Sequence, residues 1–493
     1  MTVLAVDAGT TGVTALLVAE DGTVASRGYC EFTQHFPGDG WVEHAPEDIW
    51  SATLQAARTA LSAGEAAGAG SPTCVGVTNQ RETVVLWDRE TLSAPRRAIV
   101  WQDRRTAELC DRLRDAGHEP RVRELTGLRL DPYFSATKLA WLAANEPQTW
   151  AGVTAGQVAV GTVDSYLVAR MTLGLHHVTD ASNASRTLLF DLRTGAWSPE
   201  LCELFGVPQQ ALPKIVPSYG VVGRTDPSVF AGLDLPVAGI AGDQQAALFG
   251  QTCFAVGSSK CTYGTGSFVL VNTGDQPVRS SSGLLTTVAW GLPDGRLTYA
   301  LEGAVFVTGA AVQWLRDGLG IIGSAAEVEA LAGTVADSGG IVFVPALTGL
   351  GAPDWDPGAR GLIAGITRST TRAHLARATL EAIAFEVRDV AEVMTREAAV
   401  DLPVLAVDGG ASANDLLCQL QADQLGVPVV RPQVLETTAL GAAFLAGLGT
   451  GVWASTDELT TTWRLERRFE PGIRDDGAHR MWRAAVERAK GWA

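Results

Sequence analysis

The pattern of apolar and polar positions at the start of the chain predicts a strand, a glycine turn and a second strand. Leu4–Val6 and Ala15–Val18 are runs of strand-forming apolar residues, and Gly9 and Gly12 mark a polar turn between them. A similar unit occurs near the middle of the chain, where a Gly-Thr-Gly turn precedes the apolar run 268–271. Two such units predict two lobes of related construction.

Between and beyond these units, helical periodicity alternates with short apolar strands. Helices are predicted over residues 46–61, 303–315 and 371–394, which carry apolar residues at helical spacing. Strands are predicted at 74–80 and 404–408, the second of which ends in a diglycine turn. The alternation is typical of an α/β protein with mixed sheets.

The length of 493 residues supports two or three domains with their own cores. The most favourable boundary lies near residues 250–257, just before the second strand-turn-strand unit. We therefore expect an N-terminal lobe of residues 1–250 and a C-terminal lobe of residues 251–493.

The charge balance narrows the partners of the protein. With 38 basic and 54 acidic residues the net charge is −16, and no local basic patch is evident, so nucleic acid and anionic membranes are not expected to bind. Lysine occurs at four positions only, and none of them follows a glycine. A P-loop of the form GxxxxGK is therefore excluded, and any ATP must be bound in another way.

Cysteine usage and the longest uncharged segment favour a cytoplasmic protein. The seven cysteines are scattered and form no CxxC pair, which fits a reducing compartment. Residues 437–456 are uncharged and long enough to span a bilayer. Four glycines, several hydroxyl residues and an alanine-rich centre favour a tightly packed helix inside the protein instead.

Three glycine turns beside predicted strands carry groups that suit a nucleotide. In residues 7–12, an aspartate at a strand end can anchor a cation, and the following threonines and backbone N–H groups can donate to phosphate; an ordinary hairpin is the alternative. The turn at 263–267 offers similar donor groups, and the glycines of the turn at 408–411 allow the backbone to approach a flat ligand closely. Residues 318–323 match GxGxxG but follow a helix, so they are not expected to bind a dinucleotide.

Two further features each allow a structural and a functional interpretation. Asp243 lies between a predicted strand and a predicted helix, where it could cap the helix or act as a general base toward a substrate hydroxyl. Arg81 and Glu82 could form a surface ion pair, or could bind two neighbouring hydroxyls of a polyol.

Twelve segments, taken in order, resemble the FGGY family of carbohydrate kinases and are most similar to its glycerol-phosphorylating members. The segments are DAGTTG at 7–12, GWVEHAPEDIW at 40–50, TNQRET at 78–83, VWQDRRT at 100–106, DPYFSATKL at 131–139, GTVDSYL at 161–167, HVTDASNASRTLLFD at 177–191, AGDQQAALFGQTCF at 241–254, KCTYGTGSF at 260–268, GLGAPDWDPGARG at 349–361, RATLEAIAF at 377–385 and VDGGASAN at 407–414.

The resemblance implies an actin-like, ribonuclease H-type ATPase fold with two lobes around a nucleotide cleft. It implies ATP and Mg²⁺ as cofactors and the phosphorylation of glycerol to sn-glycerol 3-phosphate in the cytoplasm, by a homo-oligomer of two or four chains. A kinase for another small polyol or a ketose is the nearest alternative. A non-catalytic actin-like nucleotide-binding regulator is a second one, against which the presence of Asp243 argues.

The resemblance also implies roles for individual residues. Asp243 would be the general base, and Asp7 would help to bind Mg²⁺. Glycerol would contact Arg81, Glu82, Trp101, Tyr133, Asp243, Gln244 and Phe268. The nucleotide would contact Thr10, Thr11, Gly12, Thr265, Gly309, Gln313, Gly410 and Asn414. The chain departs from the family at Thr14, where an arginine near the phosphates is usual.

Overall fold

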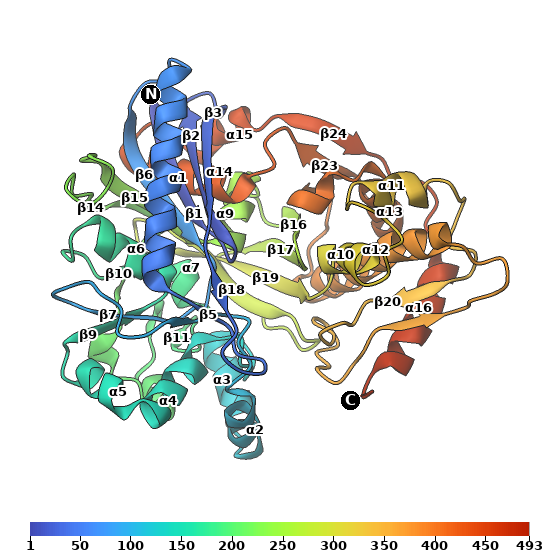
Figure 1. Ribbon diagram of the computed structural model, residues 1–493, viewed down its shortest axis with the longest axis horizontal. Helices are drawn as coiled ribbons and strands as arrows, with labels where there is room; N and C mark the ends of the chain where they lie inside the picture. The colour runs from blue at the N-terminus through green and yellow to red at the C-terminus, as the bar shows by residue number, and fades with distance from the viewer. Residues whose placement is uncertain (493) are drawn as a thin grey trace.

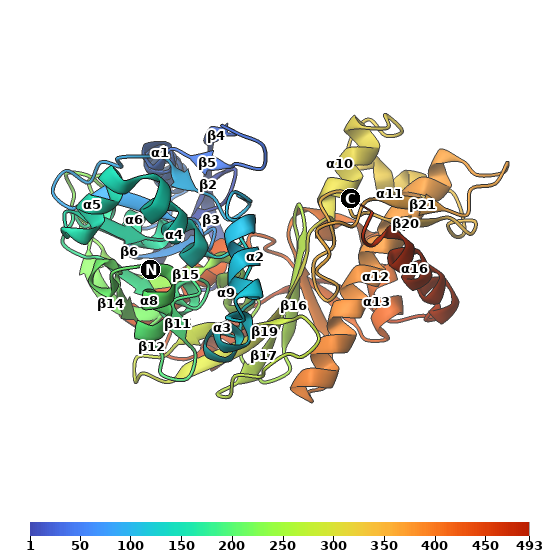
Figure 2. The same ribbon diagram turned by 90° about the horizontal axis from the view of Figure 1, so that it is seen from below.

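The computed structural model describes residues 1–492 and consists of two lobes, with the N-terminus in one and the C-terminus in the other (Figures 1 and 2). Each lobe is built on one large mixed sheet. Within residues 1–492 no helix has the length and apolar character that crossing a membrane requires.

The sheet of the first lobe has six strands, in the order β14-β15-β6-β1-β2-β3. β1 pairs antiparallel with β2 and parallel with β6, and β6 pairs parallel with β15. The hairpin predicted at the start of the chain is confirmed. The strands are β1 Thr2–Ala8, β2 Gly12–Ala19, β3 Val24–Glu31, β6 Pro72–Asn79, β14 Tyr219–Arg224 and β15 Pro236–Gly242.

The sheet of the second lobe has seven strands, in the order β18-β19-β17-β16-β22-β23-β24. β16 pairs antiparallel with β17 and parallel with β22, which repeats the arrangement around β1. The prediction of two related lobes is therefore confirmed. The strands are β16 Ser259–Tyr263, β17 Ser267–Gly274, β18 Leu285–Gly291, β19 Leu297–Val305, β22 Leu405–Asp408, β23 Val429–Pro432 and β24 Leu465–Phe469.

Helices pack against both large sheets. Residues 1–492 also form four two-stranded sheets and one three-stranded sheet. The helices are α1 Pro46–Ala66, α2 Ala107–Asp115, α3 Glu119–Thr126, α4 Ser135–Asn145, α5 Pro147–Thr154, α6 Val163–Met171, α7 Ala181–Ala184, α8 Pro199–Phe205, α9 Asp243–Gly250, α10 Gly309–Asp317, α11 Glu327–Ala332, α12 Arg372–Ala398, α13 Asp415–Leu425, α14 Thr437–Thr450, α15 Thr456–Thr462 and α16 Asp476–Ala489. The short strands are β4 Gln34–His35, β5 Glu43–His44, β7 Val85–Asp88, β8 Ala98–Ile99, β9 Val158–Gly161, β10 Val178–Asp180, β11 Phe190–Asp191, β12 Ala196–Trp197, β13 Lys214–Val216, β20 Val342–Val344 and β21 Leu362–Ala364.

One predicted helix begins later than expected. Residues 303–305 were expected to be helical, but they complete β19, and the helix α10 starts at Gly309. Gly303 pairs with Val269 of β17, and a Cβ at Gly303 would lie only 2.3 Å from the Val390 side chain of α12. The close approach of α12 to the sheet therefore fixes this segment as a strand, which periodicity alone could not reveal.

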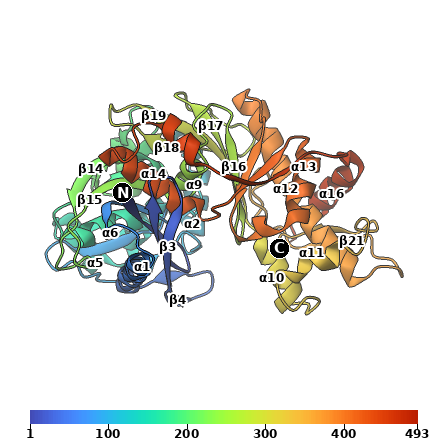
Figure 3. The same cartoon turned by 90° about the horizontal axis from the view of Figure 1, so that it is seen from above.

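The uncharged segment that begins at Thr437 forms α14, which packs on the sheet of the first lobe and against α9 (Figure 3). Ten of its residues are buried. The division of the chain at residue 250 stays a prediction. In the sequence α14 comes after residue 250, whereas all the strands of the sheet that it covers come before that residue. A segment from the last fifth of the chain thus supports α9, the helix that begins with Asp243.

Candidate active site

The turn between β1 and β2 (residues 9–12) closes with a hydrogen bond from Gly9 N to Gly12 O of 3.0 Å. Asp7 lies at the end of β1, and its Oδ1 atom is buried with no hydrogen-bond partner in the described part of the chain. Burial, and then the nearby Asp243 carboxylate, raise the pKa of Asp7 to about 8. An orphaned buried carboxylate oxygen beside a second carboxylate suits a cation.

Asp243 is the first residue of α9, directly after β15, so it projects from the junction of a central strand and a helix. Gly242 occupies the N-cap position, which decides against the interpretation of Asp243 as the cap. Its Oδ1 atom lies 3.0 Å from Arg81 Nε and accepts a hydrogen bond from Gln244 N at 2.7 Å. Burial raises the pKa of Asp243 even though Arg81 opposes the shift, which favours a carboxylate able to accept a proton.

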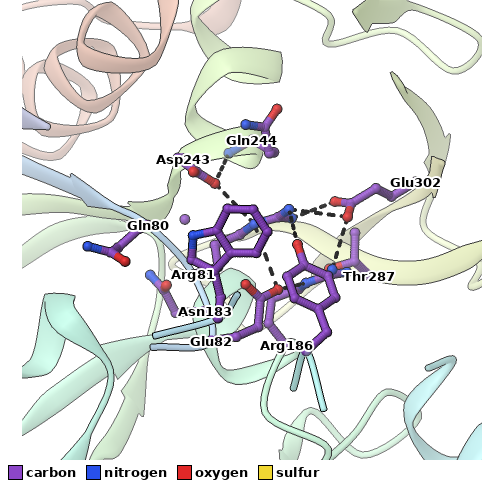
Figure 4. Close-up of polar contacts among 12 residues, drawn as sticks. Gln80, Arg81, Glu82, Asn183, Arg186, Asp243, Gln244, Thr287 and Glu302 are labelled. Atoms are coloured by element: carbon purple, nitrogen blue, oxygen red, sulfur yellow. Dashed lines mark hydrogen bonds and ion pairs between the residues drawn. The ribbon is translucent and has the colours of Figure 1, made fainter. Parts of the chain in front are cut away.

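Arg81 is at the centre of a buried polar cluster (Figure 4). It follows β6, and its side chain is 2% exposed, so it does not form a surface ion pair. Besides Asp243, its guanidinium contacts Glu302 at 2.5 Å and donates to Tyr133 Oη at 3.2 Å. The neighbouring Glu82 is 3.9 Å away from Arg81 Nε, so the two residues are not each other's main partners.

Two residues of this cluster, Arg186 and Glu302, were not predicted. Arg186 Nε donates to Glu82 Oε1 at 2.7 Å, and its Nη2 donates to Glu302 Oε1 at 2.9 Å. Burial alone would raise the pKa of Glu302, but Arg186 and Arg81 outweigh it and lower that pKa to about 2. Glu302 therefore remains ionised and joins β19 of the second lobe to the two arginines of the first.

Aromatic side chains border the cluster, and they include the three that the family resemblance predicts to contact the substrate. The rings of Trp101 and Tyr133 meet edge to face with centroids 5.6 Å apart. Arg81 lies over the Phe268 ring at 5.7 Å, so Phe268 approaches from the second lobe. We call Trp101, Tyr133 and Phe268 the aromatic wall. Trp101 Nε1 also donates to Thr10 Oγ1 at 3.0 Å, and this hydrogen bond connects the aromatic wall with the β1–β2 turn.

Gln244 and a buried lysine extend the site toward the second lobe. Lys260 of β16 donates a hydrogen bond to Gln244 Oε1, and it donates to Thr262 Oγ1 at 2.7 Å. Burial lowers the pKa of Lys260, although Asp408 and Asp243 oppose the shift. Sequence reasoning did not assign Lys260 a role, although it is one of only four lysines in the chain and lies within β16.

The predicted nucleotide residues of the second lobe fall into two groups. Thr265 lies in the β16–β17 turn, and its carbonyl accepts from Thr308 N and Ala310 N, which holds the turn against the start of α10. Gly309 and Gln313 are on that helix. Gly410 and Asn414 flank a short turn after β22, where Asn414 Oδ1 accepts from Leu417 N and caps α13. The fold thus brings the first group to one turn, whereas Asn414 is already engaged in capping.

Two adjoining family models match almost the whole chain. The N-terminal domain model of the FGGY family of carbohydrate kinases matches residues 2–250, and the C-terminal domain model matches residues 259–450. The chain belongs to the FGGY family of carbohydrate kinases. The resemblance inferred from the twelve sequence segments is therefore confirmed.

Curated FGGY relatives match over their full length. The chain is 56% identical to a glycerol kinase of Aromatoleum aromaticum over 493 residues, covering 99% of each chain. It is 51% identical to glycerol kinase 2 of Thermotoga maritima, again covering 99% of each chain.

Solved FGGY structures confirm the actin-like fold. Plasmodium falciparum glycerol kinase with ADP superposes with a TM-score of 0.92 at 33% identity, covering 99% of this chain and 98% of that one. A gluconate kinase from Lactobacillus acidophilus shares the fold with a TM-score of 0.85 at 21% identity, covering 99% of this chain and 96% of that one.

Proposed function

We propose that the chain is a glycerol kinase, which transfers the γ-phosphoryl group of ATP to glycerol and forms sn-glycerol 3-phosphate. The observation that carries the proposal is the placement of Asp243 Oδ1 3.0 Å from Arg81 Nε, at the edge of a buried cluster of hydroxyl-binding groups. A full-length relative named glycerol kinase at 56% identity supports the same substrate.

The cluster matches the chemistry of a short polyol. Arg81 and Tyr133 supply donors, and Glu82 and Asp243 supply acceptors, so adjacent hydroxyls can each be paired. Trp101 and Phe268 supply apolar surface for the carbon atoms. Each charged member already has a partner within the protein, which holds the site in place before substrate binds.

Asp243 would act on the hydroxyl that attacks. Its carboxylate accepts the hydroxyl proton while the oxygen forms a bond to the γ-phosphorus of ATP. The bond between that phosphorus and the bridging oxygen breaks, and ADP leaves. A primary alcohol is a poor nucleophile, so an aligned base contributes roughly 10²- to 10⁴-fold. The remaining rate comes from positioning and from charge neutralisation.

Mg²⁺ would be held chiefly by Asp7 together with phosphate oxygens of ATP. The orphaned Oδ1 atom of Asp7 fits such an ion. No group of three or more His, Cys, Asp or Glu side chains that could hold a metal occurs within residues 1–492. In kinases Mg²⁺ is usually bound by one or two carboxylates together with the substrate phosphates. The bound ion would neutralise phosphate charge during transfer.

The proposal is tested by measuring ADP release with Mg-ATP and glycerol, dihydroxyacetone, erythritol, xylulose or gluconate. We expect glycerol to give the highest kcat/KM, by at least about 100-fold over the five-carbon and six-carbon substrates, because the aromatic wall limits the length of the substrate. Asp243→Asn should lower kcat with glycerol by roughly 10²- to 10⁴-fold while glycerol still binds.

Asp234→Asn is the matched control, because Asp234 is exposed and pairs only with Arg224 on the surface. It should leave the kinetics unchanged. Preference for xylulose or gluconate would refute glycerol as the substrate, and full activity of Asp243→Asn would remove Asp243 from its role. Cytoplasmic location and assembly into dimers or tetramers stay predictions from the family resemblance.

A further inference from the structure

Tyr29 lies in a row of side chains that runs across the first sheet toward the β1–β2 turn. Thr14 of β2 is the register partner of both Asp7 of β1 and Tyr29 of β3. Residues paired in this way share one face of a sheet. The neighbouring Gly28 faces the other side, where a Cβ would lie 2.0 Å from Ala56 O of α1. Tyr29 is therefore on the same face as Asp7.

The phenol of Tyr29 lies against Gly12, the last residue of the turn. A Cβ at Gly12 would be 2.7 Å from Cys30 O, 2.8 Å from Tyr29 Oη and 2.9 Å from Tyr29 Cε2, so the β3 backbone and the Tyr29 ring together occupy the space that a side chain would take. Tyr29 is 41% exposed, and its hydroxyl has no hydrogen-bond partner among residues 1–492. An exposed O–H donor thus lies beside Gly12, where the turn meets β2.

Arg27 holds the ring in this position. Its guanidinium lies 5.4 Å from the centre of the Tyr29 ring, and its Nε atom is 3.2 Å from Glu436 Oε1 at the start of α14. The charge of Arg27 is thereby directed to a carboxylate and an aromatic face. The Tyr29 side chain therefore places a neutral hydroxyl, and not the charge of Arg27, next to Gly12 at the turn.

We propose that Tyr29 contacts the nucleotide and donates a hydrogen bond from Oη to its β-phosphate. The inference rests on the proposed function only in taking the β1–β2 turn as the phosphate site. Phosphate oxygens are acceptors alone, and hydrogen bonds to charged groups are the strong ones. Tyr29 would therefore add a hydroxyl donor at this turn, where the absence of a side chain at Gly12 leaves room both for the Cys30 carbonyl and for the Tyr29 ring.

Binding of Mg-ADP and of adenosine, measured by calorimetry without glycerol, tests the proposal. Tyr29→Phe keeps the ring and its packing but removes the donor. We expect it to weaken Mg-ADP binding about tenfold and to leave adenosine binding and Tm unchanged. Tyr219→Phe is the matched control, because Tyr219 is on β14 at the far edge of the same sheet. It should alter neither affinity.

Unchanged Mg-ADP affinity in Tyr29→Phe would overturn the proposal, as would an equal loss for adenosine, which would point to a general effect on the lobe. Failure of the wild-type chain to bind Mg-ADP would overturn the proposal as well. Because no alcohol is present, the ADP effect is expected even if the chain phosphorylates an alcohol other than glycerol. The two proposals can therefore fail separately.

Discussion

Glu302 of β19 binds Arg81 through both carboxylate oxygens, with Nη1–Oε2 at 2.5 Å and Nη2–Oε1 at 3.2 Å. Glu302 is fully buried and belongs to the second lobe, whereas Arg81 belongs to the first. The same carboxylate also accepts from Arg186. One side chain of the second lobe thus orients the arginine that faces the candidate base.

Replacing Glu302 with glutamine should therefore impair both the site and the fold. The change leaves two buried guanidinium groups without their shared counter-charge, which costs about 3–5 kcal/mol of stability. Arg81 would also lose its fixed orientation, so we expect KM for glycerol to rise more than KM for Mg-ATP. Calorimetric unfolding and steady-state kinetics measure the two effects.

Glu458→Gln is a suitable control, because Glu458 is an exposed residue of α15 whose carboxylate accepts a hydrogen bond from the nearby Ala454 N. It should change neither stability nor KM. If Glu302→Gln raised KM for the two substrates equally, the role of Glu302 in orienting Arg81 specifically would be wrong.

The sequence predicted the local features of the site better than its long-range pairs. The glycine turns, Asp243 and Arg81 lie at strand ends that local patterns can locate. Glu302 could not be found in this way, because its role depends on β19 meeting a loop more than two hundred positions earlier in the chain. Family resemblance supplied proposed substrate-binding roles for individual residues, but no role for Arg186 and Glu302, which pair with Glu82 and Arg81.

The packing of α14 on the first lobe was also beyond local patterns. The composition of residues 437–456 favoured a tightly packed helix, and that prediction is confirmed by α14. The packing of α14 on the first lobe depends on small residues of α14 and α9. These two helices are far apart in the sequence and come into contact only when the protein folds. A Cβ at Gly441 would lie 1.8 Å from Ala246 O, and one at Gly250 would lie 2.1 Å from Thr437 O.

Gly441→Ala should consequently separate α14 from α9 and disturb Asp243 at the start of α9. Overpacking of this kind costs about 1–3 kcal/mol, and the displaced backbone cannot be relieved by rotating a side chain. We expect Tm and kcat to fall together, with a smaller change in KM for Mg-ATP. Thermal unfolding and kinetics of the purified variant measure these changes.

Gly70→Ala provides the comparison, because no atom lies within 4 Å of a Cβ built at Gly70. It should preserve both Tm and kcat. A Gly441→Ala protein with wild-type stability would show that the two helices can separate without cost, contrary to the contact described here.

Glu386 of α12 makes the stability of the second lobe dependent on pH. Its Oε2 atom is buried without a hydrogen-bond partner in the described residues. Burial, and then the carboxylates of Asp389 and Asp354, raise the pKa of Glu386 well above its usual range. Arg483 and Lys490 pair with Asp354, and Arg483 also pairs with Asp389, whereas no ion pair of Glu386 is found within residues 1–492.

The folded protein therefore keeps a proton on Glu386 that the unfolded chain releases. Because the pKa of Glu386 is higher in the folded protein than in the unfolded chain, the bound proton stabilises the fold. This stabilisation is fully present at pH values below the pKa of the unfolded chain, and it is lost as the pH rises toward the pKa of the folded protein. The loss approaches about 1.4 kcal/mol per pH unit. Glu386→Gln has no such proton to lose. Its Tm should exceed that of the wild type by a margin that grows from pH 5 to pH 8.

Glu392→Gln on the same helix supplies the opposite case. Burial would raise the pKa of Glu392, but hydrogen bonding and charge from Arg388, followed by Arg474, lower it instead. The ionised Glu392 therefore stabilises the fold at pH values above the pKa of the unfolded chain, and this stabilisation is lost only in acid. The difference in Tm between Glu392→Gln and the wild type should not increase in favour of the variant between pH 5 and pH 8. A constant difference in Tm between Glu386→Gln and the wild type over that range would show that Glu386 is ionised in the folded protein.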